Sequence, residues 1–440
     1  MTNGSAQKDL CFVLMPFGTK EHGGGSSINF NRVYEEIIAP AIRDAGLEPL
    51  RADEEIDHGI IHKPMFERLL LSEDAVADVT LANANVFDEL GIRHAIRPRS
   101  TVIIGANDHR PPFDIAFLRT LPYSLGPNGL PTDVATDRAQ LRTHLEAART
   151  TLTDSPVYQL VELEAPLLDH LAADVFRERA LYVDRVGRDL AAAGRESVEA
   201  VRHIEGQMDS VDDLESRLLI DLLVAYRDVK AWDDIVRLVV TIPQPLASTP
   251  RVRELHALAL NRLTQREAAA DILTQLIAER GQSAETYGLL GRVYKDQWLS
   301  LPRDDARARG FLKRAIDAYR RGFEADPMDW YPGINALTLM RAGGLDEDHI
   351  PDLLPVVRFA VRRRITLGTG DYWTHATMLE LAVLDEDDLA MTEHLEDALA
   401  HAPRAWQIET TLRNVELLNT DPSSTAAKAS AALRNALDGS

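Results

Sequence analysis

The chain has 440 residues, 45% of them hydrophobic, so it is long and apolar enough to form two or three domains that each bury a core. Its formal net charge of −21 excludes the phosphate backbone of nucleic acid as the main partner, because the two would repel each other. With one cysteine, no apolar signal segment and no run of about 18 apolar residues, we expect a cytoplasmic protein without disulfides or membrane contact.

Apolar runs alternate with amphipathic segments over residues 1–130, which predicts an α/β domain with a parallel sheet, flavodoxin-like or Rossmann-like, covered by helices on both faces. We expect Cys11, in the first apolar run, to be a buried small hydrophobe. The predicted strands cover residues 10–17, 47–52, 76–80 and 101–105, with a fifth inside 113–123. The predicted helices cover 29–45, 60–72 and the residues from 86 onward.

The glycine-rich stretch 18–27 follows the first predicted strand. It matches neither the Walker motif nor the dinucleotide GxGxxG motif. We expect a mobile surface loop, with a gate over a pocket as the alternative.

The stretch that begins at Asp78 reads as a strand end, a polar loop and the start of a helix. We expect Asn85 to cap this helix, with Asp88 in the place of the usual Glu or Gln of a capping box, so that Asp88 and Glu89 lie in the first helical turn. Acids there often only complement the helix dipole, and Glu89 could pair with Arg93. The alternative is a ligand site, since ligands bind at the carboxyl ends of strands in open α/β sheets.

Histidines near this edge suggest a metal site only weakly. His58 and His62 are four residues apart, but they have neither the zincin pattern nor a cysteine partner. We therefore expect no metal.

Residues 131–210 predict a helical connector. One helix is expected over 133–152, a break over 154–160, and a long helix with charged faces over about 170–206.

Residues 211–440 predict an all-α, TPR-like solenoid. Tyr287, Leu290, Gly291 and Tyr294 fit the first-helix consensus of a tetratricopeptide repeat, and Ala315, Tyr319, Gly322 and Pro327 fit the second. Further helix pairs are expected at 255–278 and within 212–232, and the end after Thr420 is expected to fray.

Several short motifs in the first domain form a specific set through their order. They are Phe12-Val-Leu-Met-Pro-Phe-Gly18, Arg51-Ala-Asp-Glu54, Val76-Ala-Asp-Val-Thr80, Asn83-Ala-Asn-Val-Phe-Asp-Glu-Leu-Gly91 and His94-Ala. Together they resemble the prokaryotic TIR-like and nucleoside 2-deoxyribosyltransferase-like domains. The resemblance implies that Glu89 attacks or stabilises the sugar carbon of an N-glycosidic bond.

The same resemblance implies a set of ligand-binding residues around Glu89. Phe17 would stack on a base or ribose, and Asn85 would position the glutamate. Asp88 stands where the family usually has tyrosine, and a second carboxylate beside Glu89 raises the cost of ionising both. The ligand-binding candidates are Phe17, Gly18, Arg51, Asp53, Asp78, Asn83, Asn85 and Asp88.

A second resemblance covers about 212–415. Its most specific block is Gly291-Arg-Val-Tyr-Lys-Asp296, supported by Asp221-Leu-Leu-Val-Ala-Tyr and Gly333-Ile-Asn335. This region resembles the TRAF-binding, central regulatory region of apoptosis signal-regulating MAP kinase kinase kinases and its bacterial relatives. The resemblance implies a scaffold whose concave face binds a protein partner, and no kinase motif set occurs here.

Together these features predict a cytoplasmic signalling or defence protein. Its head would bind a nucleotide-like ligand, with NAD or a nucleoside derivative as possible substrate and no cofactor, and could cleave an N-glycosidic bond. Its solenoid would bind a protein, and a homo-oligomer is possible. The alternative is a non-catalytic nucleotide sensor or scaffold.

Overall fold

A computed structural model of the chain describes residues 8–22, 26–51, 62–81, 83–107, 119–150, 153–161, 170–208, 216–244, 246–302, 304–368, 370–401, 404–419 and 421–438. The chain divides into two compact units. The first comprises residues 1–225 and 242–249, and the second comprises residues 226–241 and 250–440.

The first unit contains a five-stranded parallel sheet, which confirms the predicted α/β architecture. The strands are short, and the three central ones are wholly buried, as expected of a sheet covered on both faces. In spatial order they are β4 (Glu48–Arg51), β1 (Leu10–Leu14), β5 (Asp74–Asp78), β6 (Thr101–Ala106) and β7 (Thr120–Tyr123).

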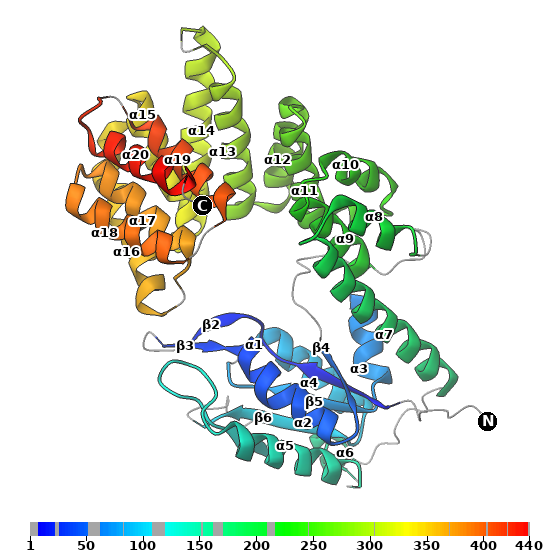
Figure 1. The fold of residues 1–440 in the computed structure, drawn as a ribbon. Coiled ribbons are helices and arrows are strands. Elements are labelled where there is room, and N and C mark those ends of the chain that lie inside the picture. The colour runs from blue at the N-terminus through cyan, green and yellow to red at the C-terminus, as the bar shows by residue number, and fades with distance from the viewer. Residues whose placement is uncertain are drawn as a thin grey trace. The chain divides into compact units, whose positions relative to one another are not determined.

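Alternate residues of the strands enter two separate cores, one on each face of the sheet. Cys11 and Val13 pack with the helical stretch α1 (Phe30–Val33), η1 (Tyr34–Ile38) and α2 (Ala39–Asp44), and with α5 (Val134–Ala148). Phe12 and Leu14 pack on the other face with α3 (His62–Leu71), α4 (Ala84–Ile96) and α7 (His170–Ala193). Figure 1 shows the sheet between these helices. The predicted burial of Cys11 is confirmed.

The expected loop at 18–27 was wrong for the residues that the structure describes. β2 (Thr19–His22) pairs antiparallel with β3 (Ser26–Asn29), and the three glycines 23–25 lie outside the described residues. The hairpin has no apolar run that would have revealed it in the sequence. It is held from outside: the amide of Asn29 donates to the carbonyl of Gly129, and a Cβ on Gly129 would lie 1.6 Å from the backbone oxygen of Ser27.

The helical connector differs from its prediction in two respects. The expected break over 154–160 contains a short helix, α6 (Pro156–Leu160), and the expected long helix over 170–206 is two helices, α7 and α8 (Val198–Glu205). Ser197 caps α8 by accepting from the amide of Ala200, at 3.2 Å. Gly194, between the two helices, allows a close approach to Ala225 of α9 (Ser216–Asp228), where an added Cβ would lie 3.2 Å from the Ala225 Cα.

The second unit is all-helical and contains the predicted repeat pairs. In chain order the helices are α10 (Trp232–Thr241), α11 (Pro250–Arg262), α12 (Arg266–Arg280), α13 (Ala284–Leu299), α14 (Ala306–Ala325), α15 (Trp330–Gly343), α16 (Ile350–Thr366), α17 (Tyr372–Leu384), α18 (Asp388–Ala400), α19 (Ala405–Leu417) and α20 (Thr425–Asp438). Most consecutive helices pack against each other, and Gly291 of α13 faces the ring of Tyr319 of α14 as the consensus spacing predicts.

Two predictions in this region were wrong. The helix pair expected within 212–232 is, in its described part, the single helix α9, and the next helix begins only at Trp232. The end after Thr420 does not fray: α20 buries Ala426, Ala429 and Leu433. Its small residues, which look like a flexible tail in the sequence, allow the helix to pack closely against its neighbours. Within the described residues, no helix is both long and apolar enough to cross a membrane.

Candidate functional site

The predicted strand-end residues lie around the point where the strand order of the sheet reverses. The chain runs from β1 to β4 on one side and then to β5 on the other, so the reversal lies between β1 and β5. In open α/β sheets ligands bind outside the carboxyl ends of the strands at this point. Phe17 and Gly18 follow β1, Arg51 ends β4 and Asp78 ends β5.

Arg51 is held between two aromatic rings. Its guanidinium carbon lies 4.8 Å from the centroid of Phe17 and 4.4 Å from that of Tyr34. Its Nη1 donates to Oδ1 of Asn31, at 3.1 Å, and the same oxygen accepts from the amide of Gly18, at 3.3 Å. The structure therefore brings Phe17, Gly18 and Arg51 together as a cation beside aromatic faces.

Sequence reasoning missed Asn31 and Tyr34, which complete this arrangement. Both lie on the helical stretch that begins at Phe30, and they read there as the polar face of an amphipathic helix. A fixed cation beside a ring can attract an anionic group and stack on a flat one.

Asp78 lies in a buried hydrogen-bond network. Its Oδ1 accepts from the amide and the hydroxyl of Thr80, at 3.0 and 2.5 Å, and its Oδ2 accepts from the hydroxyl of Tyr123, at 2.9 Å. Burial raises the pKa of Asp78 to about 6, although these hydrogen bonds oppose the rise. Both oxygens of Asp78 are thus engaged by the protein itself.

The helix α4 begins two residues earlier than expected. Asn83, in extended backbone, is the N-cap, and its Oδ1 accepts from the amides of Asn85 and Val86, at 2.9 and 3.4 Å. The predicted cap at Asn85 was wrong, and Asp88 and Glu89 lie beyond the first turn, which contains no acid. Two asparagines two residues apart offer the same capping chemistry, and the backbone path from β5 selects the first.

Side chains along α4 differ in exposure. Asn85 and Asp88 are exposed, and Glu89 is half-buried. Arg93 is fully buried and donates to the carbonyls of Leu69 and Ser72, at 2.8 and 2.7 Å, which ties α4 to the end of α3.

Asp53, a ligand candidate, and His58, of the metal alternative, lie outside the described residues. In the described ranges, no group of three His, Cys, Asp or Glu side chains is arranged to hold a metal ion.

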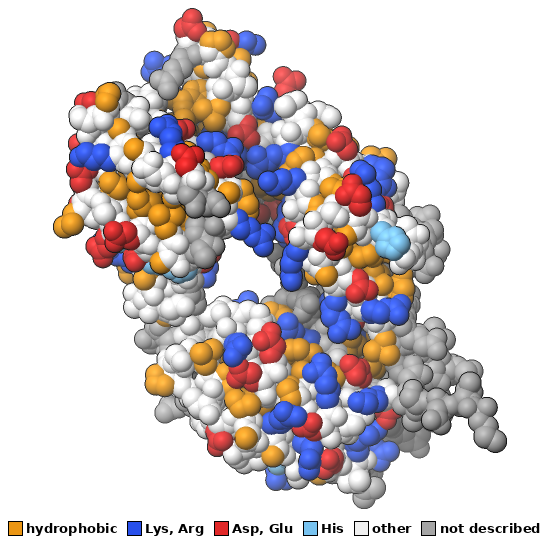
Figure 2. Space-filling model, in the orientation of Figure 1, with side chains coloured by type: hydrophobic (Ala, Val, Ile, Leu, Met, Phe, Trp, Pro, Cys, Tyr) orange, Lys and Arg blue, Asp and Glu red, His pale blue; other side chains and the backbone are white. Residues whose placement is uncertain are grey.

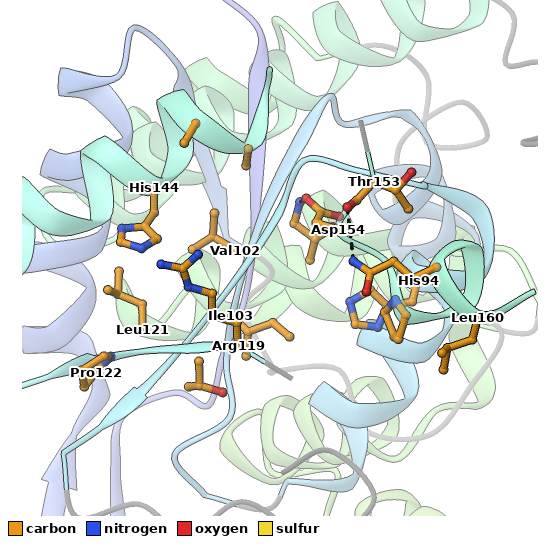
Figure 3. A pocket seen from close by; sticks show the side chains of 16 residues that line it. His94, Val102, Ile103, Arg119, Leu121, Pro122, His144, Thr153, Asp154 and Leu160 are labelled. Carbon is orange, nitrogen blue, oxygen red and sulfur yellow. Dashed lines mark hydrogen bonds between the residues drawn. The ribbon is translucent and has the colours of Figure 1, made fainter. Parts of the chain in front are cut away.

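A cavity of about 620 Å³ lies elsewhere in the first unit, where β6 and β7 begin. Its floor is apolar, from Val102, Ile103, Leu121 and Pro122, and α5 and the segment 153–160 complete its walls. Figure 3 shows Arg119 and His144 together on one side of this cavity, with His94, Thr153 and Asp154 on the other. This cavity could not be predicted from the sequence, because its lining comes from five separated segments.

The acidic side of the cavity holds a carboxyl group with one unused oxygen. Oδ2 of Asp154 accepts from the amide of Thr101, at 3.1 Å, whereas Oδ1 is buried and accepts no hydrogen bond from the part of the chain that the structure describes. Burial raises the pKa of Asp154, and burial, followed by Arg93, lowers the pKa of His94 to about 4. The cavity can therefore accept a hydrogen-bond donor at Asp154 beside a neutral imidazole.

The second unit contains a buried polar junction of four helices. Nζ of Lys295 (α13) donates to Oδ1 of Asn335 (α15) and Oδ1 of Asn414 (α19), at 3.1 and 2.9 Å. Nδ2 of Asn414 donates to Oε1 of Glu380 (α17), at 3.2 Å. Burial lowers the pKa of Lys295 and raises that of Glu380.

Comparison with known proteins gives matches over most of the chain. The family model of the MAP3K TRAFs-binding domain matches residues 86–435. Mitogen-activated protein kinase kinase kinase nsy-1 of Caenorhabditis elegans is 30% identical over 236 residues, which cover 48% of this chain and 15% of that protein. Human mitogen-activated protein kinase kinase kinase 5 is 28% identical over 259 residues, covering 56% of this chain and 18% of that protein.

The chain thus spans only 15% and 18% of the lengths of these two relatives. Among solved structures, a thermophilic TPR protein of Thermus thermophilus aligns with 14% identity and a TM-score of 0.34, covering 46% of this chain and 98% of that one.

Proposed function

This chain belongs to the MAP3K TRAFs-binding domain family, and from that membership we propose that it is a signalling protein whose helical repeats bind a protein partner. The observation that carries the proposal is the extent of the match, which runs from α4 through α20 and includes every helix of the second unit. Stacked helix pairs present extended surfaces that suit protein binding.

Binding of a protein partner can be tested with the full chain. Proteins that co-purify with it would be expressed separately, and the affinity of each purified candidate for the chain would be measured by calorimetry. We expect at least one saturable, stoichiometric complex that protects amides of the second unit from hydrogen exchange. If every purified candidate fails to bind, or protection falls only on the first unit, the repeats do not have this function.

For the head, we propose that the edge around Arg51 binds a nucleotide-like ligand and that Glu89 takes part in cleavage of its N-glycosidic bond. Support comes from the TIR-like resemblance, from the position of Phe17, Gly18 and Arg51 at the reversal of strand order, and from the guanidinium held between two rings. A carboxylate at Glu89 would stabilise or trap the positive sugar carbon as the base departs with the bonding electrons.

Incubating the full chain with NAD, and measuring released nicotinamide by chromatography, tests this cleavage. We expect release by the wild type and its loss in Glu89→Gln, whereas Glu146→Gln, an exposed glutamate on α5, retains it. Release that persists in Glu89→Gln would refute the assigned role.

The non-catalytic alternative has a distinct outcome in the same samples. A nucleotide that raises the unfolding temperature of the wild type without any base release would identify the head as a sensor. The proposed function of the repeats is independent of this result.

A further inference from the structure

Three arginines from three different helices meet on the second unit. Arg262 ends α11, Arg292 lies on α13 and Arg413 lies on α19. α11 packs against α13, and α13 is joined to α19 through Lys295 and Asn414. Arg262 and Arg413 are exposed, and Arg292 keeps 25% of its side-chain surface. We refer to these three residues as the basic patch.

Asp296 neutralises part of the patch, because its negative charge favours the protonated forms of Arg262 and Arg292. Asp296 is the carboxylate beside it: it accepts from Nε of Arg292, at 3.1 and 3.2 Å, and from Nδ2 of Asn261, at 2.8 Å. Among the described residues, neither Arg262 nor Arg413 has a carboxylate within 4.0 Å. Arg413 donates to the backbone carbonyl of Glu409, and Arg262 lies over the ring of Trp232.

Arg292 and Arg413 lie close enough to Arg262 to act on its charge. Desolvation by the surrounding protein, followed by Arg292, lowers the pKa of Arg262, whose side chain still reaches solvent, and Arg413 lowers it further, whereas Asp296 and Tyr331 oppose the fall. The pKa of the buried Lys295 is also lowered, first by burial, then by Arg292 and, to a smaller extent, by Arg413. These positive charges are grouped in a chain whose formal net charge is −21. An anionic group placed between the guanidiniums would relieve the repulsion.

Aromatic side chains adjoin the patch. Tyr331 is 44% exposed and lies near enough to Arg262 and Arg292 to interact with both electrostatically. Lys and Arg side chains gather over α13 and towards α11 on the face shown in Figure 2.

We propose that the basic patch binds a segment rich in Asp and Glu on the protein partner. The carboxylates of this segment would pair with Arg262, Arg292 and Arg413, and the aliphatic parts of its side chains would pack against Tyr331. This assignment rests on the proposed function of the repeats and names the chemistry of their partner. Charge complementarity selects a protein segment over nucleic acid, because the long polyanion would be repelled by the remaining acidic surface.

The test uses the full chain and a fluorescein-labelled peptide of ten glutamates, followed by fluorescence anisotropy. We expect saturable binding that weakens with added NaCl and falls at least about tenfold in R262E/R413E. The matched control is R280E/R309E, which makes the same charge change at exposed arginines of α12 and α14 and should bind like the wild type. Circular dichroism confirms that both variants are folded.

Several outcomes would overturn the assignment. They are no binding of the peptide by the wild type, equal loss in both double variants, and tighter binding of a ten-nucleotide oligothymidylate than of the peptide. A purified partner that binds R262E/R413E as tightly as the wild type also refutes the patch, yet leaves the binding function of the repeats intact. If no partner binds any form, that function fails, and the peptide measurement still decides the chemistry of the patch.

Discussion

Asp78 is the buried carboxyl group that fixes the end of β5, and its network with Thr80 and Tyr123 reaches across to β7. The hydroxyl of Thr80 also accepts from the amide of Ala106, at 2.9 Å, so the network joins β5, β6 and β7. A nucleotide at the sheet edge would meet a carboxyl group that is already engaged. Arg51, by contrast, is held in one orientation by Phe17, Tyr34 and Asn31, and its guanidinium provides the cationic contact there.

Burial of Asp78 makes stability depend on pH in a defined direction. The pKa of Asp78 is about 6 in the folded chain, against an ordinary value of 3.8, so the folded state binds the proton more tightly. The stabilisation is therefore complete below about pH 4 and is lost as pH rises through 6, a change of about 3 kcal/mol. Asp78→Asn should flatten this part of the profile, as measured by urea unfolding from pH 4 to 8.

The control for this prediction is Asp189→Asn, at an exposed position of α7, which should keep the wild-type profile. A profile that is equally steep in Asp78→Asn and in the wild type would contradict the assigned titration.

At the scale of helices, the close contact between α13 and α14 depends on Gly291, which has no side chain. A Cβ on Gly291 would lie 2.7 to 2.9 Å from ring atoms of the buried Tyr319, whereas a Cβ on Gly288 would lie 3.4 Å from the nearest ring atom of the half-exposed Tyr331, which is a looser contact. The two glycines lie one turn apart on the same helix, so they form a matched pair.

We expect Gly291→Ala to lower the free energy of unfolding by about 1–3 kcal/mol, because the helices must separate or the ring must move. Gly288→Ala should be neutral or slightly stabilising, because alanine favours a helix over glycine. Urea unfolding followed by circular dichroism measures both. A loss of the same size in both variants would show that helix propensity, not the approach to Tyr319, decides the effect.

The junction at Lys295 gives a second prediction for the helical unit. Lys295→Met removes the cation from a buried site and leaves the carboxyl group of Glu380 without it, so we expect a loss of about 3 kcal/mol. Lys313→Met, at an exposed position of α14, is the control and should change the free energy of unfolding little. An unchanged stability in Lys295→Met would mean that the network is energetically neutral.

Sequence patterns identified the elements that have a strong period or a fixed consensus. The apolar run that includes Cys11 and the spacing from Tyr287 to Tyr319 located β1, α13 and α14. The hairpin β2–β3 and the helix α20 were not found, because their contacts come from distant segments such as Gly129, or from small residues without an apolar stripe. At the site, the edge containing Phe17 and Arg51 followed from the alternation of strands and helices.

Other features of the site could not be predicted from the sequence. The choice of Asn83 over Asn85 as cap and the engagement of Asp78 by Tyr123 depend on the exact path of the backbone. The polar junction joins side chains up to 119 residues apart, so no local sequence pattern predicts it.

At the scale of the whole molecule, the chain consists of two units with separate cores. The family match begins within α4 and continues to residue 435, so it includes β6 and β7 as well as the repeats, more than the 212–415 region that the sequence motifs indicated. The ligand proposed for the head and the segment proposed for the basic patch would bind to different units.

We therefore expect two calorimetric unfolding transitions rather than one. Asp78→Asn should move one of them and Lys295→Met the other, because each substitution acts on the core of a single unit. Differential scanning calorimetry of the wild type and both variants checks this. A single transition that both substitutions shift equally would show that the units unfold together.

The hydrogen bond from Lys295 to Asn414 also limits where helical repeats can be added to the array or lost from it. In an open solenoid, stability is a sum over neighbouring repeats, so repeats can be added or lost with little effect elsewhere. Here α13 and α19 are joined directly by a hydrogen bond, although five helices separate them in the sequence. An extra helix pair inserted between them would pull the two ends apart. The hydrogen bond therefore requires a fixed number of helices between α13 and α19. We expect helix pairs to be added or lost only before α13 or after α19.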